Sequence, residues 1–215
     1  RMKALGKQSS FVTKRVHVIG AGTMGGDIAA WCVLRGLTVT LQDQNPQQLA
    51  PAMKRAAELF ERRLRDRLLV RDALDRLIPD VTGAGVRGAD VVIEAIFENL
   101  AVKQSLFATI ESQAKPGAIL ASNTSSLKLA DIGATMRDPT RLVGIHFFNP
   151  VAQLQLVEVV SGERTAPNWP QDAAAFVRAI DKLPLPVKDS PGFLVNRVLG
   201  PYMAAAFRMV EEGIQ

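Results

Sequence analysis

The sequence contains one cysteine, Cys32, and two histidines, His17 and His146. A single cysteine excludes an internal disulfide, which favours a reducing compartment such as the cytoplasm. So few cysteines and histidines also exclude the usual zinc sites, and we expect no metal. Uninterrupted apolar runs are only a few residues long. A membrane-spanning helix needs roughly 20 apolar residues, so the sequence predicts no membrane span.

No large excess of either charge is present, because 26 Lys and Arg face 21 Asp and Glu and leave a net charge of +5. This charge suits an anionic ligand and is too small to indicate nucleic acid binding by itself. The 215 residues are 47% hydrophobic and can bury a full core. We therefore expect a globular protein of one domain, or one domain and a fragment of a second.

Short β-branched runs alternate with amphipathic stretches, which predicts an α/β fold with a Rossmann-type doubly wound, mostly parallel sheet. We expect strands at residues 16–19, 38–41, 90–96, 118–121, 142–147, 154–160 and 185–187. Helices are expected at residues 28–34, 47–70, 72–77, 100–114 and 170–182, and again from residue 193. The last of these is apolar on more than one face and indicates the first helix of a truncated all-α domain.

A glycine motif follows the first expected strand. Gly20, Gly22 and Gly25 fit the pattern G-x-G-x-x-G, with Thr23 and Met24 between the second and third glycines. In this context the glycines permit a tight turn, backbone approach to a pyrophosphate and helix–strand packing. Asp43 ends the second strand, where a carboxylate accepts hydrogen bonds from a ribose and repels a 2′-phosphate. The pattern favours NAD over NADP, with a flavin or an ordinary turn as alternatives.

His146 ends an expected strand, and ligands of open α/β sheets bind at the carboxyl ends of strands. Glu158 follows twelve residues later in the apolar run LVEVV, where a buried carboxylate needs a partner. An imidazole held by this carboxylate could take a proton from a substrate hydroxyl. The alternative is that both residues are separately satisfied in the core. His17, inside the first strand, is expected to be a packed residue.

The segments IGAGTMGGDIA, IEAIFENLAVK, ASNTSSL, GIHFFNPV, LVEVV and DSPGFLVNR occur in this order. Together they resemble the 3-hydroxyacyl-CoA dehydrogenase family over roughly residues 14–213. The resemblance implies NAD-dependent oxidation of a (3S)-3-hydroxyacyl-CoA to the 3-ketoacyl-CoA in fatty-acid β-oxidation. It also implies a division into a connector (1–14), an NAD-binding domain with the catalytic histidine (15–190) and the start of a helical domain (191–215).

Site residues follow from the matching motifs. The resemblance implies that His146 is the general base, that Glu158 supports it, and that Ser125 and Asn196 bind the substrate oxygen. It implies that Glu98, Lys103, Asn123 and Asn149 line the cofactor. Helix-surface pairing, capping and turn formation are the alternatives for these polar residues.

The resemblance further implies a homodimer formed through the helical domain and an enoyl-CoA hydratase domain fused upstream, since the lead sequence is similar to the connector of multifunctional β-oxidation proteins. A basic stretch faces either the coenzyme A phosphates or solvent: Lys54, Arg55, Arg62, Arg63, Arg65 and Arg67. Two rival functions stay open. They are a related β-hydroxyacid or sugar-acid dehydrogenase, and a non-catalytic NAD-binding protein.

Overall fold

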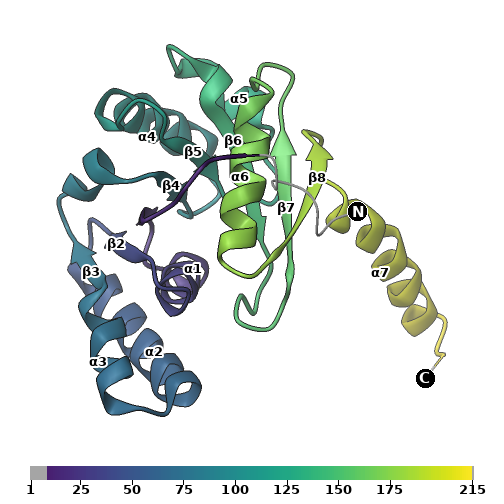
Figure 1. The fold of residues 1–215 in the computed structure, drawn as a ribbon. Helices are drawn as coiled ribbons and strands as arrows, with labels where there is room; N and C mark the ends of the chain where they lie inside the picture. The colour runs from purple at the N-terminus through teal and green to yellow at the C-terminus, as the bar shows by residue number, and fades with distance from the viewer. Residues whose placement is uncertain (1–8, 215) are drawn as a thin grey trace.

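The strands of the computed structural model form one eight-stranded sheet in the order β3-β2-β1-β4-β5-β6-β7-β8 (Figure 1). The structure describes residues 9–214, so residues 1–8 of the expected connector lie outside it. The strands are β1 Arg15–Ile19, β2 Thr38–Gln42, β3 Leu77–Asp80, β4 Val91–Glu94, β5 Ile119–Ser122, β6 Leu142–Phe147, β7 Leu156–Ser161 and β8 Leu183–Lys188.

Strands β1 to β6 pair in parallel, whereas β7 pairs antiparallel with β6 and β8 pairs parallel with β7. The chain moves outward from β1 in one direction through β2 and β3, then returns to the other side of β1 with β4. This reversal creates a switch point between β1 and β4, where open α/β sheets bind ligands. The predicted doubly wound, mostly parallel sheet is confirmed.

Helices cover both faces of this sheet. The α-helices are α1 Thr23–Leu34, α2 Pro46–Leu64, α3 Arg67–Asp75, α4 Leu100–Gln113, α5 Leu129–Ile132, α6 Asn168–Ala179 and α7 Val195–Glu211. One buried cluster joins α1, α2 and α6 to one face of the sheet, and a second joins α4 and α5 to the other. Strands β4 and β5 are buried along their whole length, because helices lie over both sides of them.

The expected helix over residues 47–70 is wrong, because the chain forms two helices there. Arg65 adopts a left-handed conformation with φ of 57°, which ends α2. The carboxylate of Asp66 then accepts hydrogen bonds from the amides of Leu68 and Leu69 and caps α3. The shorter helix expected at residues 72–77 is present, but its bounds differ. Helix α3 ends at Asp75, and the next residues form the edge strand β3, where Pro79 is tolerated.

Helix α7 confirms the expected C-terminal helix and projects away from the sheet in Figure 1. None of its residues is buried, and its apolar side chains, such as Tyr202 and Phe207, are exposed. Within residues 9–214, no helix combines the length and the apolar character needed to cross a membrane. Those residues also contain no group of three His, Cys, Asp or Glu side chains placed to hold a metal ion.

Candidate functional site

The glycine motif forms the turn between β1 and α1, and its three glycines serve different purposes. Gly20 has φ of 103°, and a Cβ atom there would lie 2.6 Å from the carbonyl oxygen of Ala95. A Cβ atom on Gly25 would lie 1.8 Å from the carbonyl oxygen of Gly20. The chain itself therefore requires both glycines. A Cβ atom on Gly22 would meet nothing within 4 Å, so this position is open to the approach of a ligand.

A cleft of about 890 Å³ opens at the switch point beside this turn. Gly20 and Gly22 line one side, Asp43 lies at the end of β2, and Ile96 and Phe97 follow β4. The cleft has the size of a cofactor site and contains both the open glycine and a carboxylate. These residues therefore fit a dinucleotide.

Asp43 links the turn to the start of α2. Its Oδ2 atom accepts a hydrogen bond of 2.9 Å from the amide of Ala21, and its Oδ1 atom accepts one of 2.9 Å from the amide of Asn45. A carboxylate oxygen can accept more than one hydrogen bond, so Asp43 keeps the capacity to bind a hydroxyl group in the cleft. Of the two intervening residues, Thr23 is exposed, and the half-buried Met24 packs against the core.

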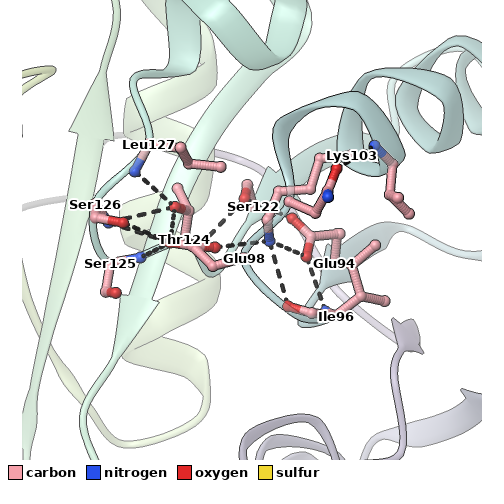
Figure 2. Close-up of polar contacts among 11 residues, drawn as sticks. Glu94, Ile96, Glu98, Lys103, Ser122, Thr124, Ser125, Ser126 and Leu127 are labelled. Carbon is pink, nitrogen blue, oxygen red and sulfur yellow. Dashed lines mark hydrogen bonds and ion pairs between the residues drawn. The ribbon is translucent and has the colours of Figure 1, made fainter.

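Lys103 projects from α4 into a buried polar cluster and is not a surface residue. Only 1% of its side chain is exposed, and its Nζ atom lies 2.5 Å from Oε1 of Glu94 and 3.1 Å from Oε2 of Glu98. Figure 2 shows the ammonium group joined to both carboxylates and to the carbonyl oxygen of Ile96. The alternative of a surface Glu98–Lys103 pair is therefore wrong, because Lys103 is buried and also contacts the fully buried carboxylate of Glu94.

Glu98 also organises the loop after β5. Its Oε1 atom accepts hydrogen bonds from the hydroxyl of Thr124, the amide of Ser125, and the amide and hydroxyl of Ser126 (Figure 2). Partial burial alone would raise the pKa of Glu98, but the Thr124 hydroxyl, the Lys103 ammonium and the Ser125 amide together lower it to about 2. Glu98 is therefore ionised at neutral pH.

His146 and Glu158 lie directly opposite each other on β6 and β7. The Nδ1 atom of His146 is 2.8 Å from Oε2 of Glu158, while Oε1 of Glu158 accepts hydrogen bonds from the amides of Leu194 and Val195. Burial would raise the pKa of Glu158, but these hydrogen bonds and the imidazole together lower it. The structure thus brings the two predicted residues together.

The imidazole of His146 is packed against two aromatic rings and keeps one nitrogen available. Phe148 and Phe193 lie with ring centroids 4.6 and 5.7 Å from the imidazole, which is 6% exposed. Among residues 9–214, Nε2 of His146 has no hydrogen-bond partner. An imidazole with Nδ1 bound to a carboxylate can accept a proton at Nε2.

The other predicted polar residues differ in how they are held: Asn123 and Asn196 make hydrogen bonds near this pair, whereas Asn149 does not. Oδ1 of Asn123 accepts a hydrogen bond of 2.9 Å from the amide of Phe147, which joins the ends of β5 and β6. Nδ2 of Asn196 lies 3.4 Å from the carbonyl oxygen of Ser125, so these two predicted substrate residues are neighbours. Asn149 is exposed and precedes Pro150 through a cis peptide bond. Among residues 9–214, no hydrogen bond joins Asn149 to the other predicted residues.

His17 is confirmed as a packed residue. It is fully buried, and its ring nitrogens lie 2.7 Å from Oγ1 of Thr40 and 2.8 Å from Oε1 of Gln42. Burial lowers the pKa of His17, although the Gln42 hydrogen bond and the charge of Asp80 oppose that shift. Both nitrogens are occupied, so His17 has no capacity left for catalysis.

The basic stretch, which runs from α2 to the start of α3, contains two arginines with a hydrogen bond to the backbone and four residues without one in the described chain. Arg55 donates a hydrogen bond of 3.0 Å to the carbonyl oxygen of Gly22, and Arg63 donates one of 3.3 Å to that of Ala152. Lys54, Arg62, Arg65 and Arg67 are exposed. Arg55 thus supports the glycine turn, and phosphate binding by the other basic residues stays a prediction.

Sequence reasoning missed Glu94 and Ser122, which complete the cluster around Lys103. Glu94 stands in the apolar run DVVIEAI, just as Glu158 stands in LVEVV. The same expectation, that a buried carboxylate needs a partner, would have identified it. Ser122 gave no signal, because a serine at the end of a strand is common.

Comparisons with known proteins agree with this geometry. Residues 15–190 match the model of the 3-hydroxyacyl-CoA dehydrogenase NAD-binding domain family. The chain is 39% identical to a probable 3-hydroxyacyl-CoA dehydrogenase of Caenorhabditis elegans, over 92% of this chain and 67% of that protein. It is 35% identical to the fatty acid oxidation complex subunit alpha of Idiomarina loihiensis, over 100% of this chain but only 30% of that subunit.

A solved structure supports the same relationship. The crystal structure of 3-hydroxybutyryl-CoA dehydrogenase from Escherichia coli superposes with a TM-score of 0.89 at 36% identity, covering 95% of this chain and 44% of that one. The chain therefore spans less than half the length of two of these three relatives. The family match over residues 15–190 and the identity to the Caenorhabditis elegans protein show that the chain belongs to the 3-hydroxyacyl-CoA dehydrogenase family and contains its NAD-binding domain.

Proposed function

We propose that the protein containing this chain oxidises a (3S)-3-hydroxyacyl-CoA to the 3-ketoacyl-CoA, as a step of fatty-acid β-oxidation. The observation that carries the proposal is the 2.8 Å contact between His146 and Glu158 at the carboxyl end of β6. Hydroxyl oxidation needs a base that removes the proton as the hydride departs. An imidazole fixed at one nitrogen and open at the other meets this need.

His146 acts as the general base in this reaction. Its Nε2 atom takes the proton from the substrate hydroxyl, and the resulting imidazolium is stabilised by the carboxylate of Glu158 through Nδ1. The amides of Leu194 and Val195 hold the other carboxylate oxygen, so Glu158 cannot swing away from the ring. Phe148 and Phe193 exclude water from the imidazole.

Ser125 and Asn196 bind the reacting oxygen. The Ser125 side chain is exposed, and its backbone amide is fixed by Glu98. Asn196 lies beside Ser125 and supplies an amide group that can polarise the developing carbonyl. Two donors to one oxygen would stabilise the negative charge that develops on it as the proton leaves, and so lower the barrier.

We propose that NAD is held in the cleft, which Gly20, Gly22 and Asp43 line. The family resemblance adds Thr23, Met24, Gly25, Glu98, Lys103, Asn123 and Asn149 to the proposed cofactor residues. When bound, NAD supplies the hydride acceptor for carbon-3 of the substrate. Asp43 would bind the adenosine ribose hydroxyls and disfavour a 2′-phosphate by charge repulsion.

Several features of the whole protein follow as proposals from the same family. Residues 15–190 would form the NAD-binding domain, and 191–215 would begin a helical domain through which two copies dimerise. The many exposed apolar side chains of α7 support this. An upstream enoyl-CoA hydratase domain, joined by the connector 1–14, and a cytoplasmic location complete the proposal.

The direct test follows NADH absorbance during reduction of acetoacetyl-CoA by the full-length protein. Turnover that depends on both NADH and the thioester supports the proposed reaction. Binding of NADH without turnover would favour a non-catalytic NAD-binding protein. Reduction of a free β-ketoacid by NADH, without reduction of the CoA thioester, would favour the other dehydrogenase class.

A further inference from the structure

Glu94 is a fully buried carboxylate at the end of β4 and is not among the residues that line the cleft. It accepts three hydrogen bonds, all from groups inside the protein. Its Oε1 atom accepts hydrogen bonds of 2.8 Å from the amide of Ile96 and 2.5 Å from Nζ of Lys103. Its Oε2 atom accepts one of 2.6 Å from the hydroxyl of Ser122. One side chain thus ties the strand end to α4 and to β5 (Figure 2).

The first connection runs through β5 to the loop after it. The hydroxyl of Ser122 donates to Glu94 and accepts a hydrogen bond of 3.2 Å from the amide of Thr124. The proton of this hydroxyl is committed to the carboxylate, so its lone pairs face the amide. Glu94 therefore sets the direction of the Ser122 hydroxyl that anchors the start of the loop.

The second connection runs through the ion pairs. Glu94 holds the ammonium of Lys103, which lies 3.1 Å from Oε2 of Glu98. Glu98 then accepts hydrogen bonds from three residues of the loop: Thr124, Ser125 and Ser126. Because Lys103 is 1% exposed, its position depends on these two carboxylates and not on solvent.

We propose that Glu94 is a positioning residue that fixes the loop 124–126 through both connections and thereby aims Ser125 at the substrate oxygen. The effect on catalysis rests on the proposed function, in which Ser125 binds that oxygen, whereas the effect on the loop does not. Glu94→Gln retains the shape of the side chain but removes the charge. Lys103 and Ser122 donate to different oxygens of Glu94. Glutamine replaces one of these oxygens with an amide NH2 donor, so one of the two hydrogen bonds is lost when the side chain keeps its position.

The experiment measures amide hydrogen exchange across residues 122–128 in the full-length protein. In Glu94→Gln, the amides of residues 124–127 should exchange about tenfold faster or more, because loop opening becomes less costly. Glu94 contacts none of these amides directly, so faster exchange there requires transmission through Ser122 and Lys103. Exchange within twofold of the parent protein would overturn the proposal.

Asp90→Asn is the matched control. Asp90 lies at the opposite end of β4, and its Oδ1 atom is 2.5 Å from Nζ of Lys115. This variant also removes a carboxylate from a lysine pair, but the pair lies just before β4 and just after α4, at the end of the strand away from the loop. It should leave loop exchange within twofold. Equal acceleration in Asp90→Asn and Glu94→Gln would show a loss of general stability and overturn the proposal.

Kinetics provide the second readout. Glu94→Gln should lower kcat/KM for acetoacetyl-CoA reduction by about tenfold, the scale of a misplaced substrate contact. Fast loop exchange with unchanged kcat/KM would overturn the positioning role. An inactive parent protein that still shows the predicted exchange pattern would contradict the proposed reaction alone and leave the loop connection supported.

Ser122→Ala keeps the test decisive if Glu94→Gln does not fold. It cuts only the first connection and leaves Lys103 paired with both carboxylates. Relative to the parent protein, we expect exchange to accelerate more at the amide of Thr124 than at the amide of Ser126, because Ser126 remains bound to Glu98. Unchanged exchange at Thr124 would overturn the connection through Ser122.

Discussion

His146 and Glu158 face each other as a register pair across the antiparallel strands β6 and β7, with Nδ1 and Oε2 2.8 Å apart. The antiparallel pairing makes this contact possible, because residues directly opposite on one face of two such strands have adjacent side chains. The pair is therefore built into the rigid sheet and does not depend on a loop. Such placement suits a base whose geometry must be held closely.

His146→Gln should lower turnover by about 10²- to 10⁴-fold, the range typical of general acid–base groups. Glutamine can still donate to Glu158, so the fold should persist. The measurement is kcat for acetoacetyl-CoA reduction, together with the dissociation constant of NADH. Affinity for NADH should stay within about threefold, because His146 does not line the cofactor cleft. A variant with kcat within threefold of the parent would show that His146 is not the base.

The sequence predicted the sheet and the site through features that act locally. The strand of residues 142–147 was predicted with the bounds that the structure has, because the short, mostly apolar run LVGIHF is typical of a buried strand. Glu158 was identified because its burial demanded a partner. The break at Arg65 was missed, since a left-handed arginine carries no residue signature. Strand β3 was missed because its four residues, one a proline, form only by adding to the edge of β2.

The cluster around Lys103 shows a second reason for incomplete prediction. The family resemblance identified Glu98 and Lys103, but not that Lys103 is buried between two carboxylates. Residues nine and 28 positions from Glu94 meet its two oxygens. These contacts arise from the pairing of β4 with β5 and the packing of α4 over them. Single-residue patterns contain no information on such distant contacts.

Asp43→Ala should weaken NAD binding by about tenfold or more, equivalent to the loss of roughly 1.4 kcal/mol. The carboxylate is proposed to bind the ribose, and it also holds the amide of Ala21 in the glycine turn. Titration calorimetry with NAD and NADP measures both effects. The preference for NAD over NADP should decrease, because the charge that repels a 2′-phosphate is gone. Unchanged NAD affinity would contradict the assignment of Asp43 to the ribose.

Glu98 should contribute to stability in a pH-dependent way. Burial raises its pKa, but the hydrogen bond from Thr124 and the charge of Lys103 outweigh burial. Together they lower the pKa from 4.5 to about 2 in the folded protein. A carboxyl group with a lowered folded-state pKa stabilises the fold above its unfolded pKa, and this contribution disappears as the pH falls towards the folded value. The stabilisation should therefore be complete above about pH 4.5 and decline down to about pH 2.

The comparison of parent protein with Glu98→Gln isolates this effect from other acidic groups. Denaturant unfolding at about pH 7 should show a lower free energy of unfolding for the variant. That difference should shrink as the pH falls below 4.5, because the parent also loses its carboxylate. A difference that stays constant down to about pH 3 would mean that Glu98 is not held in its ionised form by the loop.

Gly22→Ala and Gly25→Ala should separate cofactor binding from folding within one turn. An alanine Cβ at residue 25 would lie 1.8 Å from the backbone oxygen of Gly20, so the turn or α1 must move. We expect Gly25→Ala to lower the melting temperature by several degrees, the scale of a destabilisation of a few kcal/mol.

A Cβ atom at residue 22 would meet no atom within 4 Å, and Gly22 has φ of −63°, so Gly22→Ala should change the melting temperature without cofactor only a little. Its methyl group instead occupies the open side of the turn, where the pyrophosphate would approach, and NAD affinity should fall by about tenfold or more. Thermal unfolding with and without NAD measures both effects. Full stabilisation of Gly22→Ala by NAD would show that the dinucleotide does not approach the backbone at Gly22.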